Sequence, residues 1–104
     1  MFKNFRSYQM ALALYRAILE LSIKSAIEAD QLKRASLSIV LNLAEGSGKR
    51  TAKDRRRFFQ MSFGSLREVQ SLLEILEEDS LAEQADQLAG SIWRLCQRPG
   101  CLPP

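Results

Sequence analysis

The sequence predicts an all-α fold, an up-down-up-down antiparallel four-helix bundle. Three observations predict it. Apolar residues recur at alternating spacings of three and four through four segments of the chain. The few glycines and prolines fall mostly between these segments or at the tail, and no segment alternates apolar and polar residues as a strand would. A chain of 104 residues is also the length of one domain. We therefore expect residues 1–98 to form a single bundle and residues 99–104 a loose tail.

The first two helices are predicted from stripes in the N-terminal half. The first starts near residue 4 or 7 and fades near residue 24, and its stripe is Phe5, Tyr8, Leu12, Tyr15 and Leu19, widened by Leu14, Ile18 and Leu21. The second covers about residues 28–44, with a row of Leu32, Ala35, Ile39 and Leu43. We expect Gly46 and Gly48 to end it, because glycine readily adopts the left-handed conformation that follows many helices.

The third and fourth helices are predicted with their caps. Thr51 is the expected N-cap of the third, with Asp54 at the capping-box position. Its seam has the 3,4 spacing of a coiled coil: Phe59, Ser62, Leu66, Val69, Leu73 and Leu76. Ser80 and Glu83 are expected to cap the fourth helix, and its row is Leu81, Ala85, Leu88, Ile92 and Leu95. The run Arg98-Pro99-Gly100 should end it.

Charge is unevenly distributed along the chain, although the net charge is only +3. Residues 33–57 hold eight basic residues against Glu45 and Asp54, a local +6. Residues 65–90 hold Arg67 against seven acidic residues, a local −6. A molecule with a basic and an acidic region can bind a polyanion, or can bind copies of itself with the basic region against the acidic one.

Six cations are concentrated on the connection after the second helix and on the first turns of the third: Lys49, Arg50, Lys53, Arg55, Arg56 and Arg57. Successive helical residues are rotated by about 100°, so the three consecutive arginines cannot all face the core. The start of a helix also favours anions. These six are the candidate nucleic-acid-binding residues. The alternative is a solubilising surface or ion pairs with the acidic helices. Phe58 and Phe59 are expected to pack in the core.

Several chemistries are disfavoured. The chain has no histidine, which removes the commonest general base and metal ligand. Gly46-Ser47-Gly48-Lys49 is not a phosphate-binding loop, because Leu43 stands where the pattern needs its first glycine and Arg50 where it needs Ser or Thr. We therefore expect no catalytic residues, no metal and no cofactor, and so no enzyme. With no membrane-spanning run, no signal peptide and two nearby cysteines, we expect a soluble, cytoplasmic protein.

Polar residues beside the core are expected to be structural. Asn42 should tie down the following loop, and Glu45 should pair with Arg50 or Arg34. Gly64 lies in the middle of the third helix, where glycine costs about 1 kcal/mol relative to alanine. We expect it to allow a close approach of the second helix at Ala35 or Ser38.

A set of residues spread over the second and third predicted helices resembles a bacterial four-helix-bundle family, the proteins encoded in 23S rRNA intervening sequences. Accessory proteins of diversity-generating retroelements are related to this family. The motif comprises Arg34, Ala35, Ser38, Ile39, Asn42, Leu43, Ala44, Glu45, Gly46, Arg50, Phe58, Phe59, Gly64, Ser65, Leu66 and Glu68. The resemblance implies a homopentamer with a basic surface that binds nucleic acid and, in the retroelement branch, a reverse transcriptase. It makes the six cations the electrostatic surface, and Arg34, Ser38, Asn42, Glu45, Gly46, Gly64, Ser65 and Glu68 structural.

These observations predict a non-enzymatic oligomeric adaptor whose six cations bind RNA or DNA phosphates, as an accessory protein to a reverse transcriptase in a retroelement. The alternative is a protein–protein interaction scaffold. There the basic and acidic regions mediate self-assembly or partner binding, with no nucleic-acid role.

Overall fold

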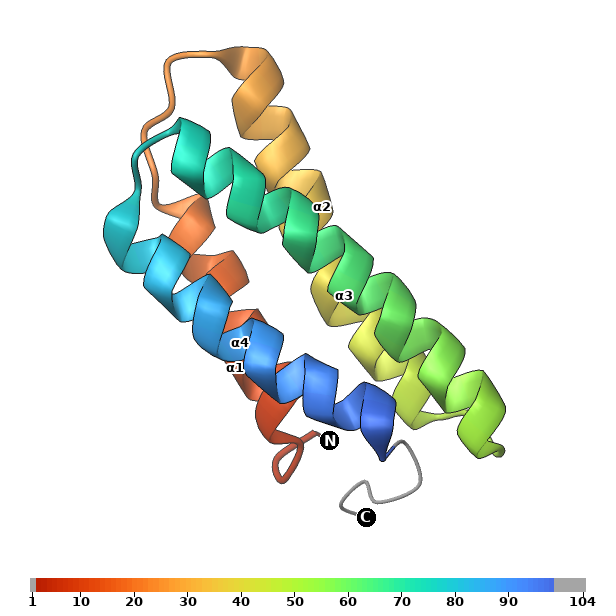
Figure 1. The fold of residues 1–104 in the computed structure, drawn as a ribbon. Helices are drawn as coiled ribbons and strands as arrows, with labels where there is room; N and C mark the ends of the chain where they lie inside the picture. Colours follow the sequence, from red (N-terminus) through yellow and green to blue (C-terminus); the bar gives the residue numbers. More distant parts are fainter. Residues whose placement is uncertain (1, 99–104) are drawn as a thin grey trace.

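The computed structural model describes residues 2–98, and these form the predicted all-α bundle (Figure 1). The helices are α1 (Arg6–Leu19), α2 (Ala26–Ser47), α3 (Ala52–Ile75) and α4 (Asp79–Gln97). Each helix packs against its neighbours along the chain, and α4 closes the ring against α1. The start of α1, the end of α2, the start of α3 and the end of α4 therefore share one end of a molecule 42 Å long. The predicted tail and the Pro99-Gly100 stop lie outside the described residues.

The core is formed by the predicted rows of α2, α3 and α4 and by part of the predicted stripe of the first helix, in which Phe5, Leu14 and Ile18 are buried. Ala11, Leu14 and Ile18 are buried in α1, whereas Tyr8, Leu12 and Tyr15 are half-buried and Leu19 is exposed. Ser7 of α1 faces α4, and its hydroxyl is hydrogen-bonded to the hydroxyl of Ser91 on that helix. Tyr8 and Tyr15 are partly buried and pack against the core. Within residues 2–98, no helix has the length and hydropathy needed to cross a membrane.

Helix ends agree with the prediction at α3 and differ at α2 and α4. The Thr51 hydroxyl accepts a hydrogen bond from the Asp54 backbone N–H at 3.1 Å, which confirms the cap. Gly46 lies inside α2, and Gly48 is its C-cap with a right-handed φ of −90°, so the left-handed glycine stop was wrong. The Ser80 cap was also wrong, because α4 starts at Asp79 after Glu78.

A polar seam joins α2 to α3. The Ser62 hydroxyl donates to the Ile39 carbonyl at 2.9 Å, and the Ser38 and Ser65 hydroxyls are hydrogen-bonded at 2.8 Å. Asn42 Nδ2 donates to the Ser38 carbonyl at 2.9 Å and to its hydroxyl at 3.0 Å. Asn42 therefore braces this seam. The prediction that it ties down the following loop was wrong.

The close-approach glycine is Gly46, and the expectation for Gly64 was wrong. A Cβ at position 46 would lie 2.7 Å from Cε1 of the fully buried Phe59 ring and 3.0 Å from Cβ of Phe58. A Cβ at position 64 would have nothing within 4 Å, because Gly64 is exposed. The helices therefore approach closely at the end of α2, and Ser65 rather than Gly64 contacts Ser38.

Candidate nucleic-acid interface

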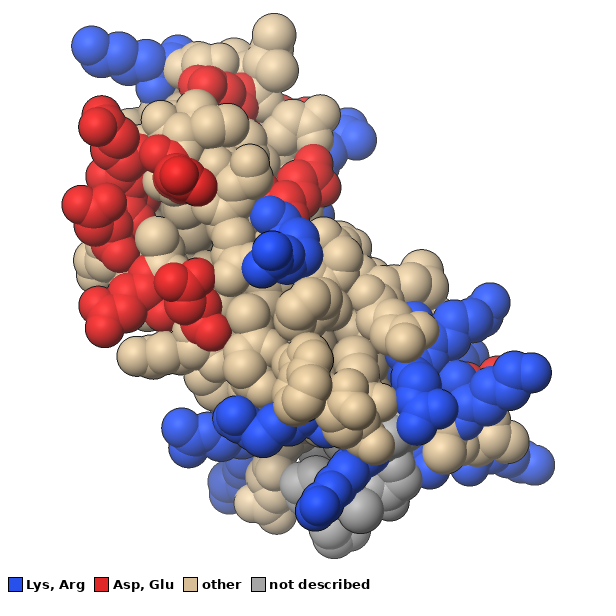
Figure 2. All heavy atoms as spheres, in the orientation of Figure 1, with Lys and Arg blue, Asp and Glu red and all other residues tan. Residues whose placement is uncertain are grey.

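The topology gathers ten basic residues at one end of the bundle, which we call the basic end. They come from the start of α1, the α2–α3 connection, the first turns of α3 and the end of α4: Lys3, Arg6, Lys49, Arg50, Lys53, Arg55, Arg56, Arg57, Arg94 and Arg98. Figure 2 shows basic side chains gathered at the lower end of this view, while acidic ones gather around the α3–α4 turn. The charge separation along the sequence is thus also a separation in space.

Four of the six predicted cations are exposed, and one of these, Arg56, hydrogen-bonds to the backbone of α4. Arg50, Lys53 and Arg57 are exposed, and none of them has an ion pair with an acidic side chain within residues 2–98. Arg57 lies over the Phe58 ring, with its guanidinium carbon 4.9 Å from the ring centroid. The alternative of ion pairs with the acidic helices is therefore not found within the described chain for these three residues.

Phe58 supports cations, whereas Phe59 belongs to the core. Phe59 is fully buried, as predicted, but Phe58 is only half-buried. Besides Arg57, the Lys49 ammonium lies 5.0 Å from the Phe58 ring centroid. A cation over an aromatic face is attracted by the electron-rich ring, so Phe58 lowers the cost of holding two like charges close together.

Arg55 and Arg56 hold the backbone in place. Arg55 Nη1 donates to the carbonyls of Lys49 at 2.9 Å and Arg50 at 3.1 Å, which braces the α2–α3 connection. Arg56 Nε donates to the Cys96 carbonyl at 2.9 Å, which joins α3 to the end of α4. Both contribute positive charge, but changing either would also disturb the fold.

The polar residues of the motif pair differently from the prediction. Glu45 forms its ion pair with Lys49, at 3.1 Å, rather than with Arg50 or Arg34. Arg34 instead pairs with Asp30, one turn earlier on α2, at 3.0 Å. Glu68 is exposed on α3. These ion pairs are local and solvent-exposed, and such pairs contribute little to stability.

Sequence reasoning missed the cations contributed by α1 and α4. Arg6, Arg94 and Arg98 line one shallow groove of about 290 Å³ between the start of α1 and the end of α4. Each is isolated in the sequence, so no local charge cluster marks it. The signal is the up-down topology itself, which brings both helix ends beside the start of α3.

Cys96 lies in the last turn of α4, where its carbonyl accepts the hydrogen bond from Arg56, and its thiol carries no charge near neutral pH. Burial raises the pKa of its thiol, and the positive charge of Arg56 opposes that rise. A thiol with a raised pKa stays protonated, which makes it a weak nucleophile. It therefore adds no negative charge that would repel a phosphate from the basic end.

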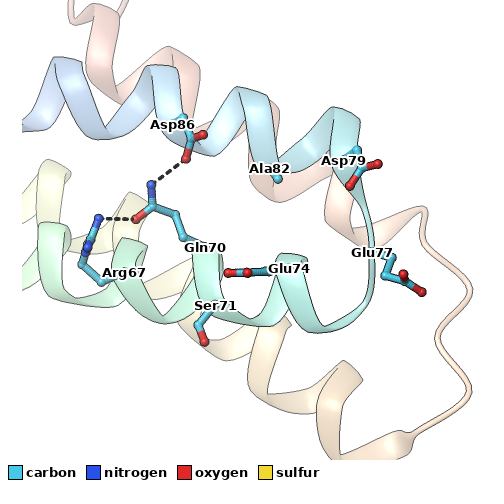
Figure 3. Close-up of a pocket in the computed structure, with 8 residues that line it drawn as sticks. All are labelled: Arg67, Gln70, Ser71, Glu74, Glu77, Asp79, Ala82 and Asp86. Carbon is cyan, nitrogen blue, oxygen red and sulfur yellow. Dashed lines mark hydrogen bonds between the residues drawn. The ribbon is translucent and has the colours of Figure 1, made fainter.

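The opposite end carries an acidic groove between α3 and α4 (Figure 3). Glu74, Glu77, Asp79 and Asp86 line it together with Arg67, Gln70, Ser71 and Ala82, around a volume of about 650 Å³. Gln70 links the two helices, accepting from Arg67 at 3.0 Å and donating to Asp86 at 2.9 Å. The groove is open and polar, with no second cation beside Arg67 among its lining residues to balance the carboxylates.

A comparison with family models finds one described as 23S rRNA-intervening sequence protein, which matches residues 3–97. The match covers all four helices and both charged ends, and it confirms the resemblance drawn from the motif of α2 and α3. A comparison with curated proteins finds no match.

Proposed function

This chain belongs to the 23S rRNA-intervening sequence protein family, and we propose that it is a non-enzymatic adaptor that binds RNA, or DNA, by its phosphates. The observation that carries the proposal is the basic end: ten cations from four segments, with Arg50, Lys53 and Arg57 exposed and free of ion pairs within residues 2–98. The description of the family, which refers to intervening sequences of 23S rRNA, is consistent with an RNA ligand.

Binding of this kind is electrostatic. A cation placed against a phosphate releases condensed counterions, and this release supplies sequence-independent affinity. Arg50, Lys53 and Arg57 make these contacts, and Arg55 and Arg56 keep the connection and the end of α4 in the shape that presents them. The start of α3 adds its partial positive charge.

Self-association multiplies this binding. Leu37 and Leu41 lie one turn apart on α2, and Met61 lies one turn before Ser65, whose hydroxyl contacts Ser38. All three apolar side chains are exposed, which supports a contact with another copy of the chain. In the homopentamer that the family resemblance implies, five basic ends act together, and a reverse transcriptase is the protein partner in the retroelement branch.

The proposal is tested by fluorescence anisotropy of a labelled structured RNA and a labelled DNA duplex, titrated with the protein over a series of salt concentrations. Four to six phosphate contacts, made by Arg50, Lys53 and Arg57 with other cations of the basic end, predict that the logarithm of the DNA association constant falls with the logarithm of salt concentration with a slope of about −3.6 to −5.4. Absence of binding even at low salt would overturn the proposal.

A second candidate is a protein-interaction scaffold, and the acidic groove of α3 and α4 favours it. The two charged ends lie at opposite ends of a 42 Å molecule, so a basic end can meet an acidic groove only on another molecule. Light scattering distinguishes this candidate. Assemblies that dissociate in high salt, and on changing Glu74→Lys with Glu77→Lys, would support it if nucleic acid does not bind.

A further inference from the structure

We propose that the groove between α3 and α4 beside the basic end holds one unpaired nucleobase, so that the protein prefers single-stranded to duplex nucleic acid. The inference rests on the proposed function, because the basic end must hold the phosphates on either side of that base. It adds the class of ligand, which phosphate binding alone leaves open.

Trp93 is the first observation. It is the single tryptophan of the chain and is 56% exposed, although the residue before it, Ile92, is fully buried. Its place on α4 is outside the core row, so packing of the bundle does not explain it. A large exposed aromatic side chain is a common feature of surfaces that contact a ligand.

The groove around Trp93 has the chemistry of a base pocket. Gln60 and Phe63 of α3 line it with Trp93, Cys96 and Gln97 of α4, around a volume of about 210 Å³. Trp93 and Phe63 offer aromatic surfaces for a planar ring. The two glutamine amides offer both donors and acceptors for the edge of a base. The Cys96 thiol, protonated because burial raises its pKa, does not repel an anionic ligand.

Cations border this groove. Arg56 donates to the Cys96 carbonyl, so its guanidinium lies at the groove's α4 wall. Arg56 and Arg57 also precede Gln60 by four and three residues, which makes them its neighbours on the surface of α3. A ligand that joins a planar ring to a negative charge fits this arrangement, and a nucleotide is such a ligand. An apolar side chain of a protein partner would leave the amides and the cations unused.

The pocket distinguishes single strands from duplexes. The bases of a duplex are stacked on one another, so their faces are not available to Trp93, whereas an unpaired base can turn out and stack on an aromatic side chain. Stacking tolerates any base, because each has a π-face. The preference therefore concerns strandedness more than sequence.

The test uses three RNA probes of equal length: single-stranded oligoadenylate, an abasic oligomer with the same phosphates, and a duplex. Because Trp93 is the only tryptophan, its fluorescence reports on this groove alone. We expect oligoadenylate to quench it and to bind tighter than the abasic oligomer. Changing Trp93→Ala should weaken oligoadenylate binding about 5- to 150-fold, to the abasic level, and leave abasic binding unchanged.

A second variant, Trp93→Phe, should recover part of the lost affinity, because it restores an aromatic face. Equal affinity for the base-bearing and abasic oligomers, with unchanged fluorescence and a steep salt dependence, would overturn this inference while the proposed function stands. Such a result would assign Trp93 to contact with a protein. Loss of binding to all three probes at low salt would overturn the proposed function itself.

Discussion

At the scale of single residues, the turn between α3 and α4 holds the one non-glycine residue with a left-handed backbone among residues 2–98. Glu77 has φ of 57°, and around it the Glu78 N–H bonds to the Leu73 carbonyl at 2.9 Å and the Glu77 N–H to the Glu74 carbonyl at 3.1 Å. This pair of bonds is the Schellman motif, whose left-handed position is usually glycine. Glu77 thus ends the helix in a conformation that is unfavourable for a residue with a Cβ.

We therefore expect Glu77→Gly to raise the free energy of unfolding by about 1 kcal/mol, because glycine adopts this conformation without steric cost. Urea denaturation followed by circular dichroism measures it. Glu77→Ala is the matched control, since it removes the same negative charge but keeps the Cβ, and it should change stability by less than about 0.5 kcal/mol. Equal gains from both variants would mean that charge repulsion, not backbone conformation, is relieved.

Residue-scale predictions from sequence succeed where the signal is local. The Thr51 cap depends on a hydroxyl and the N–H three residues later, and both are visible in the sequence. The helix α4 starts at Asp79, directly after the left-handed turn at Glu77, and no glycine marks that turn in the sequence, so the prediction of a Ser80 cap is wrong.

At the scale of helices, the contact between α2 and α3 decides which glycine allows the two helices to approach closely. Apolar spacing predicts that both helices exist and which rows are buried. It does not predict their rotation finely enough to tell whether Gly46 or Gly64 meets the neighbouring helix. The structure places Gly46 against Phe59 and leaves Gly64 exposed. The orientation of α1 was missed for the same reason, since Ser7 and Ala11 are buried while Tyr8 and Tyr15 pack at the edge of the core.

Alanine substitutions at the two glycines should therefore have opposite effects. Gly46→Ala places a Cβ 2.7 Å from the fully buried Phe59 ring, which forces a shift in the packing and should lower the free energy of unfolding by about 1–3 kcal/mol. Gly64→Ala, in an exposed helix interior, should raise it by about 1 kcal/mol. Thermal unfolding of the two variants and the parent chain measures both. A loss at position 64 equal to that at position 46 would contradict this packing of α2 on α3.

At the scale of the whole molecule, helix order explains how the basic end forms. The cluster at the α2–α3 connection was predicted because its cations are consecutive in the sequence. Arg6, Arg94 and Arg98 join it only because the up-down topology brings the start of α1 and the end of α4 to the same end. The sequence also does not reveal that Arg55 and Arg56 donate to backbone carbonyls, because the partners of these hydrogen bonds are set by the fold.

The most direct test of the proposed function compares the RNA affinity of two variants, each with three cations changed to glutamate. Arg50→Glu, Lys53→Glu and Arg57→Glu together change exposed cations of the basic end that have no ion pair within residues 2–98. The control changes three exposed cations elsewhere, Arg16→Glu, Lys24→Glu and Lys33→Glu, with the same change in net charge.

The measurement is anisotropy of a labelled structured RNA over a salt series, with circular dichroism to verify helicity. We predict that the basic-end variant binds about tenfold or more weakly and that its salt slope falls in magnitude by about 2 to 3, because three phosphate contacts are lost. The control should bind within about threefold of the parent chain. Equal losses in both variants, or no loss in the first, would contradict RNA binding at the basic end.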